Sequence, residues 1–183
     1  GLNGFKSNGV GLVVERDTRD NQNSPSAGST FLFNTLSYRE SFGGEEDFDV
    51  YTLKSRKYFK HFTDYVLAVR LDGRWSVDAP AGAYSTVDLR GYTQGQYLAP
   101  HMTTVEIEER IPFTKKWGGE IFTGIASLYG SSPSSNDNAN WYPSVGAGVN
   151  YMLKEESQMI IRADVAAGEA GNYGIYLQFG RAF

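Results

Sequence analysis

The chain has 183 residues, enough for one domain or for part of a larger one. Its net charge of −4 provides no basic surface for nucleic acid, and the absence of cysteine excludes disulfide bonds and thiolate chemistry. No apolar run approaches the ~18 residues of a transmembrane helix, and no N-terminal stretch resembles a secretory signal, so we expect a mature chain, a fragment or a cytosolic protein.

Aromatic residues and glycine are abundant, with 12 Tyr, 11 Phe, 3 Trp and 21 Gly. This composition favours strands joined by turns. Helical periodicity is not evident, whereas apolar and polar residues alternate repeatedly along the chain. In chain order, the alternation predicts nine strands, over residues 10–19, 29–41, 48–59, 64–76, 101–113, 118–130, 141–153, 158–168 and 172–183.

The segments between the predicted strands are of two kinds. KHFT, TKKW and KEES are short, SFGGEEDF and GSSPSSNDNANW are longer and polar, and residues 77–100 form the longest loop. Short turns on one side and long loops on the other are typical of outer-membrane β-barrels, whose strands need about 9–11 residues to cross the bilayer. The sequence therefore predicts an all-β fold, an antiparallel transmembrane β-barrel with eight or nine visible strands, as a single domain over residues 1–183.

The alternation separates apolar from charged side chains within each strand. In residues 64–76, Leu67, Val69 and Leu71 share one parity, and Arg70 and Asp72 share the other. A soluble β-sandwich would show the same period, so alternation alone leaves both folds open. Aromatic residues at strand ends, as in interfacial girdles, and charges of both signs deep within strands favour the barrel. The expected lumen charge network comprises Arg70, Asp72, Arg74, Arg110, Arg162 and Asp164.

The last predicted strand has an apolar face that continues to the end of the sequence. This terminal face comprises Tyr173, Ile175, Leu177, Phe179 and Phe183. Nothing follows it in the sequence to cover it. We therefore expect lipid to contact this face, together with Leu67, Ile107 and Ile161 on earlier strands.

The longest loop, residues 77–100, contains the tetrad Leu89, Arg90, Gly91 and Tyr92, and the strand after it ends in EERIPF. This arrangement resembles the bacterial surface antigen family, the barrel domains of BamA/TamA-type outer-membrane assembly and translocation proteins. The family has a Val/Leu-Arg-Gly-Phe/Tyr tetrad in an extracellular loop, and the strand after that loop commonly reads Glu-Tyr-Arg-Phe-Pro-Leu. The resemblance covers roughly residues 9–183, and the closing aromatic strand is similar to the family's C-terminal recognition signal.

The resemblance implies that this loop folds back into the barrel and that Arg90 contacts acidic or aromatic residues on the wall. The family often has an Asp on the following strand, where this sequence has Gly124. The expected acidic partner of Arg90 is therefore Glu106 or Glu108. A buried guanidinium needs such an acceptor, because an unpaired buried charge is costly.

The number of predicted strands is odd, whereas bacterial single-chain barrels have even counts, and barrels of this family usually have 16 strands. Two explanations remain open. The chain is the C-terminal part of a larger barrel, or residues 10–19 are not a wall strand and eight strands remain. An eight-stranded barrel would be filled by its side chains.

No catalytic or metal-binding pattern emerges. The only histidines, His61 and His101, have no second histidine nearby, so we expect no metal site and no cofactor. Glu106 and Glu108 share a face and could form an acid–base pair as in glycosidases, but paired arginines account for them better. The sequence therefore predicts a protein that is not an enzyme.

Three functions are compatible with these patterns. The first is an outer-membrane barrel that assists insertion of barrel proteins or passage of polypeptide. The second is a passive membrane anchor or pore for a partner or an N-terminal domain. The third is a soluble β-sandwich or ligand-binding barrel. For the first two we expect the lipid bilayer as a partner, along with other outer-membrane proteins or a periplasmic domain, and no nucleic acid.

Overall fold

The computed structural model describes residues 5–130 and 141–183 as an all-β fold, as predicted. Two short 3-10 helices, η1 (Glu40–Phe42) and η2 (Ala81–Ala83), lie in connections. The strands are β1 (Gly9–Asp17), β2 (Gly28–Tyr38), β3 (Phe48–His61), β4 (Tyr65–Val77), β5 (Ser85–Thr86), β6 (Leu98–Ala99), β7 (His101–Pro112), β8 (Trp117–Tyr129), β9 (Trp141–Lys154), β10 (Met159–Gly168) and β11 (Tyr173–Phe179).

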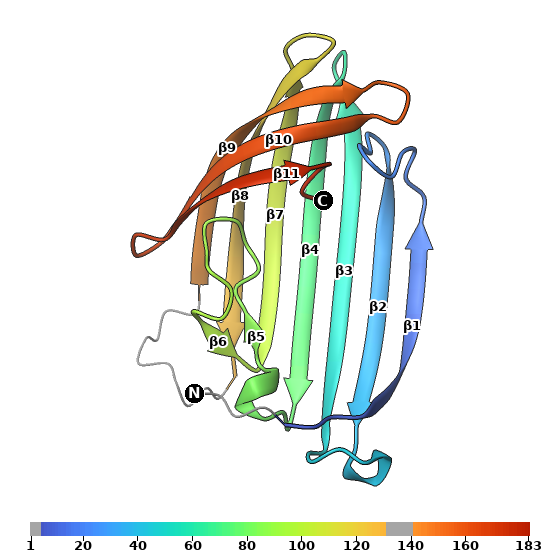
Figure 1. The fold of residues 1–183 in the computed structure, drawn as a ribbon, viewed down its shortest axis with the longest axis vertical. Coiled ribbons are helices and arrows are strands. Elements are labelled where there is room, and N and C mark those ends of the chain that lie inside the picture. The colour runs from blue at the N-terminus through green and yellow to red at the C-terminus, as the bar shows by residue number, and fades with distance from the viewer. Residues whose placement is uncertain (1–4, 131–140) are drawn as a thin grey trace.

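Nine of these strands form one antiparallel sheet in the order β1-β2-β3-β4-β7-β8-β9-β10-β11, so neighbours along the chain are neighbours in space (Figure 1). Strands β5 and β6, both within the longest connection, form a separate two-stranded sheet. Each of the nine predicted ranges overlaps one strand of the large sheet. The largest discrepancy is at the last strand, which ends at Phe179 and not at residue 183.

The large sheet is open, not closed as a barrel. Among the described residues, β1 pairs only with β2 and β11 pairs only with β10, so both edges are free. The eight-strand explanation is wrong, because β1 pairs with β2 along its whole length, from Gly9 opposite Tyr38 to Asp17 opposite Thr30. Residues 10–17 of the first predicted strand therefore do belong to the sheet.

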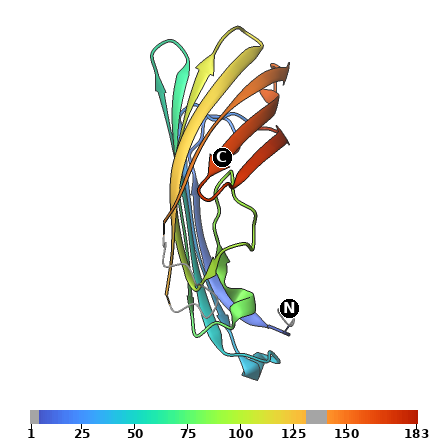
Figure 2. The same cartoon turned by 90° about the vertical axis from the view of Figure 1, so that its left-hand side faces the viewer.

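The sheet is strongly curved. Figure 2 shows the strands bent around one side, with the connection between β4 and β7 and the C-terminus lying in the concavity. In Figure 1, β9, β10 and β11 cross over the direction of the earlier strands. Curvature of this kind follows from the right-handed twist of strands, which accumulates across a large sheet.

The two faces of the sheet differ in character. On β7, Thr104, Glu106 and Glu108 face the concavity and are buried, whereas Val105 and Ile107 face the convex side and are exposed. The register places Ile107 beside Val69 and Thr123 of the neighbouring strands. Exposed apolar residues of the convex face include Leu71, Val105, Ile107, Ile121, Ile125, Val145, Val149 and Val165.

The convex face has no covering layer in the described part of the chain. The two-stranded β5–β6 sheet lies on the concave side, where Ser85 accepts a hydrogen bond from Arg74. Of the residues expected to contact lipid, Ile107 and Leu177 are exposed, and Leu67 and Ile161 are half-buried. These four side chains therefore do not form one dry interior, as a β-sandwich would require.

The connections sort to two ends of the sheet. The connections between β3 and β4, between β7 and β8 and between β9 and β10 are short and lie at one end, together with residues 18–27, and we call this the short-turn end. Residues 39–47 lie at the other end, which we call the long-loop end, and the connection of residues 78–100 also leaves and rejoins the sheet there. The predicted loop GSSPSSNDNANW lies almost entirely outside the described residues. None of the described helices is long and apolar enough to cross a membrane.

Candidate functional site: a charged cluster on the concave face

The connection between β4 and β7 returns into the concavity and brings the tetrad with it. Val87, Leu89 and Tyr92 are buried in an apolar cluster with residues of the sheet. Gly124 on β8 makes room for this packing, because a Cβ at that position would lie 2.8 Å from Leu89 Cδ2. The position where the family often has Asp is therefore filled here by the side chain of Leu89. The other members of the cluster are Ala99, Met102, Ala126, Leu128 and Tyr142.

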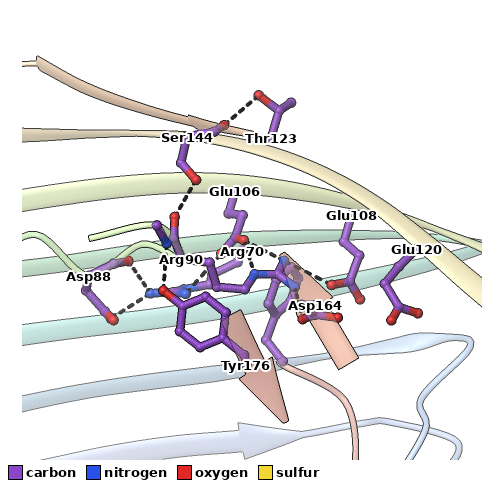
Figure 3. Close-up of polar contacts among 12 residues, drawn as sticks. Arg70, Asp88, Arg90, Glu106, Glu108, Glu120, Thr123, Ser144, Asp164 and Tyr176 are labelled. Carbon is purple, nitrogen blue, oxygen red and sulfur yellow. Dashed lines mark hydrogen bonds and ion pairs between the residues drawn. The ribbon is translucent and has the colours of Figure 1, made fainter. Parts of the chain in front are cut away.

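Arg90 lies at the centre of the concave face, with its side chain only 7% exposed. Its Nε donates to Glu106 Oε1 at 2.8 Å, and its Nη2 lies 3.0 Å from Glu108 Oε2. Its Nη1 also donates to Asp164 Oδ2 on β10 at 3.1 Å (Figure 3). The guanidinium stacks on the Phe122 ring, 3.3 Å from its centroid. Arg90 thus contacts both carboxylates expected from the sequence, and a third carboxylate and an aromatic ring in addition.

A second arginine extends the cluster toward the loop. Arg70 on β4 donates from Nη1 to Glu106 Oε2 at 3.0 Å and from Nε to Asp72 Oδ2 at 2.8 Å. Its Nη2 donates to Asp88 Oδ2 at 2.6 Å. Glu106 therefore lies between Arg70 and Arg90, one on each carboxylate oxygen. Arg56 on β3 continues the chain of contacts through a bidentate pair with Asp72.

A third arginine extends the cluster toward the short-turn end. Arg162 on β10 is fully buried and donates to Asp164 at 2.6 Å and to Glu108 at 3.1 Å. Glu120 on β8 lies 3.4 Å from Arg162 Nε and accepts a hydrogen bond from Asn150 at 2.6 Å. Gly148 leaves room for the carboxylates of Asp164 and Glu120, since a Cβ at this position would lie 2.0 Å from Asp164 Oδ1 and 2.7 Å from Glu120 Oε1.

Two predicted members of the network behave differently. Arg110 belongs to the cluster, because its Nε donates to Glu108 Oε1 at 2.9 Å. Arg74 does not, because its Nη1 donates to the hydroxyl groups of Ser76 and Ser85 and to the carbonyl oxygen of Ala83. Arg74 therefore fastens the base of the loop to β4, with no carboxylate among these partners.

Backbone and hydroxyl groups complete the attachment of the tetrad. The Gly91 amide donates to the Tyr176 hydroxyl of β11 at 2.7 Å, and Gly91 has a φ of 98°, a conformation that favours glycine. The Tyr92 hydroxyl donates to the Pro143 carbonyl of β9 at 2.6 Å and accepts from the Glu169 amide at 2.8 Å. The Ser144 hydroxyl also donates to the carbonyl oxygen of Arg90. The tetrad therefore connects β7 and β8 to the last three strands.

Several cluster residues were not singled out in the sequence. Asp88, Glu120, Arg56 and Tyr176 all contribute contacts. Glu120 and Arg56 share the parity of apolar residues such as Phe122 and Tyr58, so alternation does not mark them as clearly as it marks Arg70. Asp88 lies in an irregular segment and Tyr176 is aromatic, and neither carries a pattern that would reveal its partner.

The terminal face is only partly as expected. Tyr173, Ile175, Leu177 and Phe179 are 74–79% exposed on one face of β11. Phe183 does not share that face, because the strand ends at Phe179 and Gly180 adopts a φ of 86°. Its ring packs against the buried cluster of Tyr58, Val66 and Ala68, and its carbonyl oxygen accepts a hydrogen bond from Arg110 Nη2 at 2.6 Å. The expectation of a lipid-facing Phe183 is therefore wrong.

The cluster is suited to holding structure together rather than to acid–base chemistry. Glu106 and Glu108 each contact more than one guanidinium, so neither oxygen pair is free to accept a substrate proton. Charges buried in this way are tolerated because each has partners of opposite sign. No group of three or more His, Asp or Glu is arranged to hold a metal in residues 5–130 and 141–183.

Comparison with known proteins adds no identification. No protein-family model matches the chain, and no curated protein matches it significantly.

Proposed function

We propose that this chain is part of the wall of an outer-membrane β-barrel of the BamA/TamA type, which assists insertion of barrel proteins or passage of polypeptide. The observation that carries the proposal is the two-sidedness of one large sheet. Its convex face presents exposed apolar side chains, while its concave face holds buried ion pairs around Arg90. A soluble sandwich buries its apolar face, whereas a membrane barrel turns that face outward.

Aromatic side chains near both ends of the convex face support this orientation. At the long-loop end, Trp75 Nε1 donates to the Tyr129 hydroxyl at 2.6 Å. Trp141 is exposed at the same end, where it lies opposite Ser127 of β8. At the other end, Trp117 packs edge-on against Tyr151. The stretch from Trp141 to Tyr151 spans roughly 33 Å along the strand, which a tilt of about 45° reduces to roughly 23 Å, near the height of an outer-membrane apolar band.

The free edges support a role in handling other chains. The edges of β1 and β11 each present unpaired backbone groups, and an exposed edge can template an added strand. In β1, both faces are exposed, including Leu12 and Val13. The edges are the places where a client strand, or further strands of a larger barrel wall, would pair.

Insertion activity is tested with the protein reconstituted in liposomes. We expect an outer-membrane barrel client to fold into these liposomes faster than into empty ones, as measured by its heat-modifiable gel mobility. Arg90→Ala should reduce the acceleration, while Arg74→Ala, outside the ion-pair cluster, should leave most of it. Equal client folding rates in loaded and empty liposomes would refute the insertion role.

A passive anchor is the second candidate, and the filled concavity favours it. The loop with Arg90, the ion pairs and Phe183 occupy the interior side of the sheet. Such a plugged scaffold conducts few ions, and Arg90→Ala should raise the conductance by loosening the loop. A high conductance in the unmodified protein would instead indicate an open pore.

A further inference from the structure

The short-turn end of the concave face opens into a cavity of about 350 Å³. Residues from the β1–β2, β3–β4, β7–β8 and β9–β10 connections and from the segment after β11 all line it. Its lining contains only two acidic side chains, Asp64 and Glu155, but five basic ones. The basic residues are Lys60, Arg110, Lys115, Lys116 and Arg181.

Three of these five cations are already neutralised. Lys60 Nζ lies 2.7 Å from an oxygen of Asp64, Arg110 pairs with Glu108 at 2.9 Å, and Arg181 Nη1 lies 3.4 Å from Glu120. Lys115 and Lys116 have no ion pair within the described part of the chain, and both are exposed in the β7–β8 turn. Glu155 in the same lining has no ion pair there either, so the two lysines leave one uncompensated positive charge at the cavity, in a chain whose net charge is −4.

We propose that this cavity is a docking site for an acidic polypeptide segment of a partner. Positive side chains around a concave opening concentrate the field and attract oppositely charged ligands. The concave-side residues Val66, Asn150 and Met152 line the cavity together with Ile111 and Trp117 of the convex parity, so it lies mainly on the interior side of the sheet and extends to the convex edge at this end. A segment that approaches the short-turn end from the interior side of the sheet reaches these residues. In an outer-membrane barrel the short turns face the periplasm, so the expectation of a periplasmic partner at this end rests on the proposed function.

The test measures binding of a fluorescein-labelled octaglutamate peptide to the detergent-solubilised protein by fluorescence anisotropy. Lys115→Gln combined with Lys116→Gln should weaken the Kd about tenfold. The matched control combines Lys57→Gln with Lys154→Gln, which removes the same charge from exposed sites outside the cavity lining and should change the Kd by less than about twofold. Raising the salt concentration should weaken binding of the unmodified protein.

Three results would overturn the proposal. Equal loss in both double variants would mean that only net charge matters, and equal binding of labelled octalysine would exclude charge recognition. Lysine-dependent binding of phosphatidylglycerol vesicles without any binding of octaglutamate would make lipid the occupant. Because peptide binding is measured without a client or a bilayer, its failure is distinguishable from failure of the insertion role.

Discussion

Arg90 is the residue on which the concave face is organised. It contacts two carboxylates on β7 and one on β10, and its guanidinium plane covers Phe122. Removing one partner of a buried ion pair is far more damaging than replacing the whole pair, because the remaining charge stays buried and unpaired. Arg90 has three such partners, so its loss affects several strands at once.

We expect Arg90→Ala to lower the free energy of unfolding by about 3–5 kcal/mol, the range for breaking a buried pair. The measurement is equilibrium urea unfolding from detergent micelles or bilayers, followed by tryptophan fluorescence. Arg74→Ala is the matched control, since Arg74 donates to hydroxyl and carbonyl oxygens. Loss of the Arg74 side chain should lower the free energy of unfolding by less, about 1–2 kcal/mol. Equal effects of the two substitutions would contradict the central role of Arg90.

At the scale of elements, the connection between β1 and β2 is held by one carboxylate. Asp20 Oδ1 accepts hydrogen bonds from the amides of Ser26 and Ala27 at 2.9 and 3.1 Å, and Oδ2 accepts from the Ser26 hydroxyl. The same connection is tied to the β9–β10 turn by a hydrogen bond from Asn23 Nδ2 to the Ser157 carbonyl at 2.8 Å. Asp20 therefore shapes a segment that links the β1–β2 hairpin, at one edge of the sheet, to the β9–β10 hairpin near the other edge.

The pH dependence of this connection follows from the pKa of Asp20. Partial burial raises this pKa, but the hydrogen bonds from Ser26 and Ala27 outweigh burial and hold it below its ordinary value of 3.8. The carboxylate therefore stabilises the folded loop fully above that value, and the stabilisation is lost as pH falls through the lowered pKa. The Ala27 amide resonance should titrate in NMR spectra with a midpoint below 3.8, and Asp20→Asn should abolish the titration. A midpoint above 3.8 would contradict the sign of this shift.

At the scale of the whole molecule, the exposed convex face is the surface on which the proposed membrane wall would differ from a water-exposed sheet. Ile107 lies in the middle of this face, beside Val69 and Thr123. Phe62, 86% exposed, lies in the β3–β4 turn at the end of the sheet. An arginine near the bilayer midplane costs about 2–4 kcal/mol, and one near the interface about 0–1 kcal/mol.

We therefore expect Ile107→Arg to destabilise the bilayer-inserted protein by about 2–4 kcal/mol, and Phe62→Arg by at most about 1 kcal/mol. Denaturant unfolding from lipid bilayers measures both. In a sheet exposed to water, both surface substitutions would fall within about 0.5 kcal/mol of zero. Small and equal effects would therefore argue against lipid as the cover of the convex face.

The sequence predicts the strands well because alternation and turn chemistry are local properties. The nine ranges and the pairing of Arg90 with Glu106 and Glu108 all follow from short stretches, the latter with help from the family resemblance. Asp164 as a third partner and the Gly91–Tyr176 hydrogen bond depend on the curvature that brings β10 and β11 over the loop. The inward turn of Phe183 depends on Gly180, whose positive φ no parity pattern reveals.

The contacts of the tetrad have a consequence for the order of assembly. Strands of the large sheet pair with their sequence neighbours, so hairpins can form as soon as each is available. The tetrad, in contrast, meets residues 74 and 85 positions later in the chain, at Asp164 and Tyr176. Such distant contacts carry a loop-closure entropy and form slowly. The loop can therefore complete these contacts only after the final hairpin has formed.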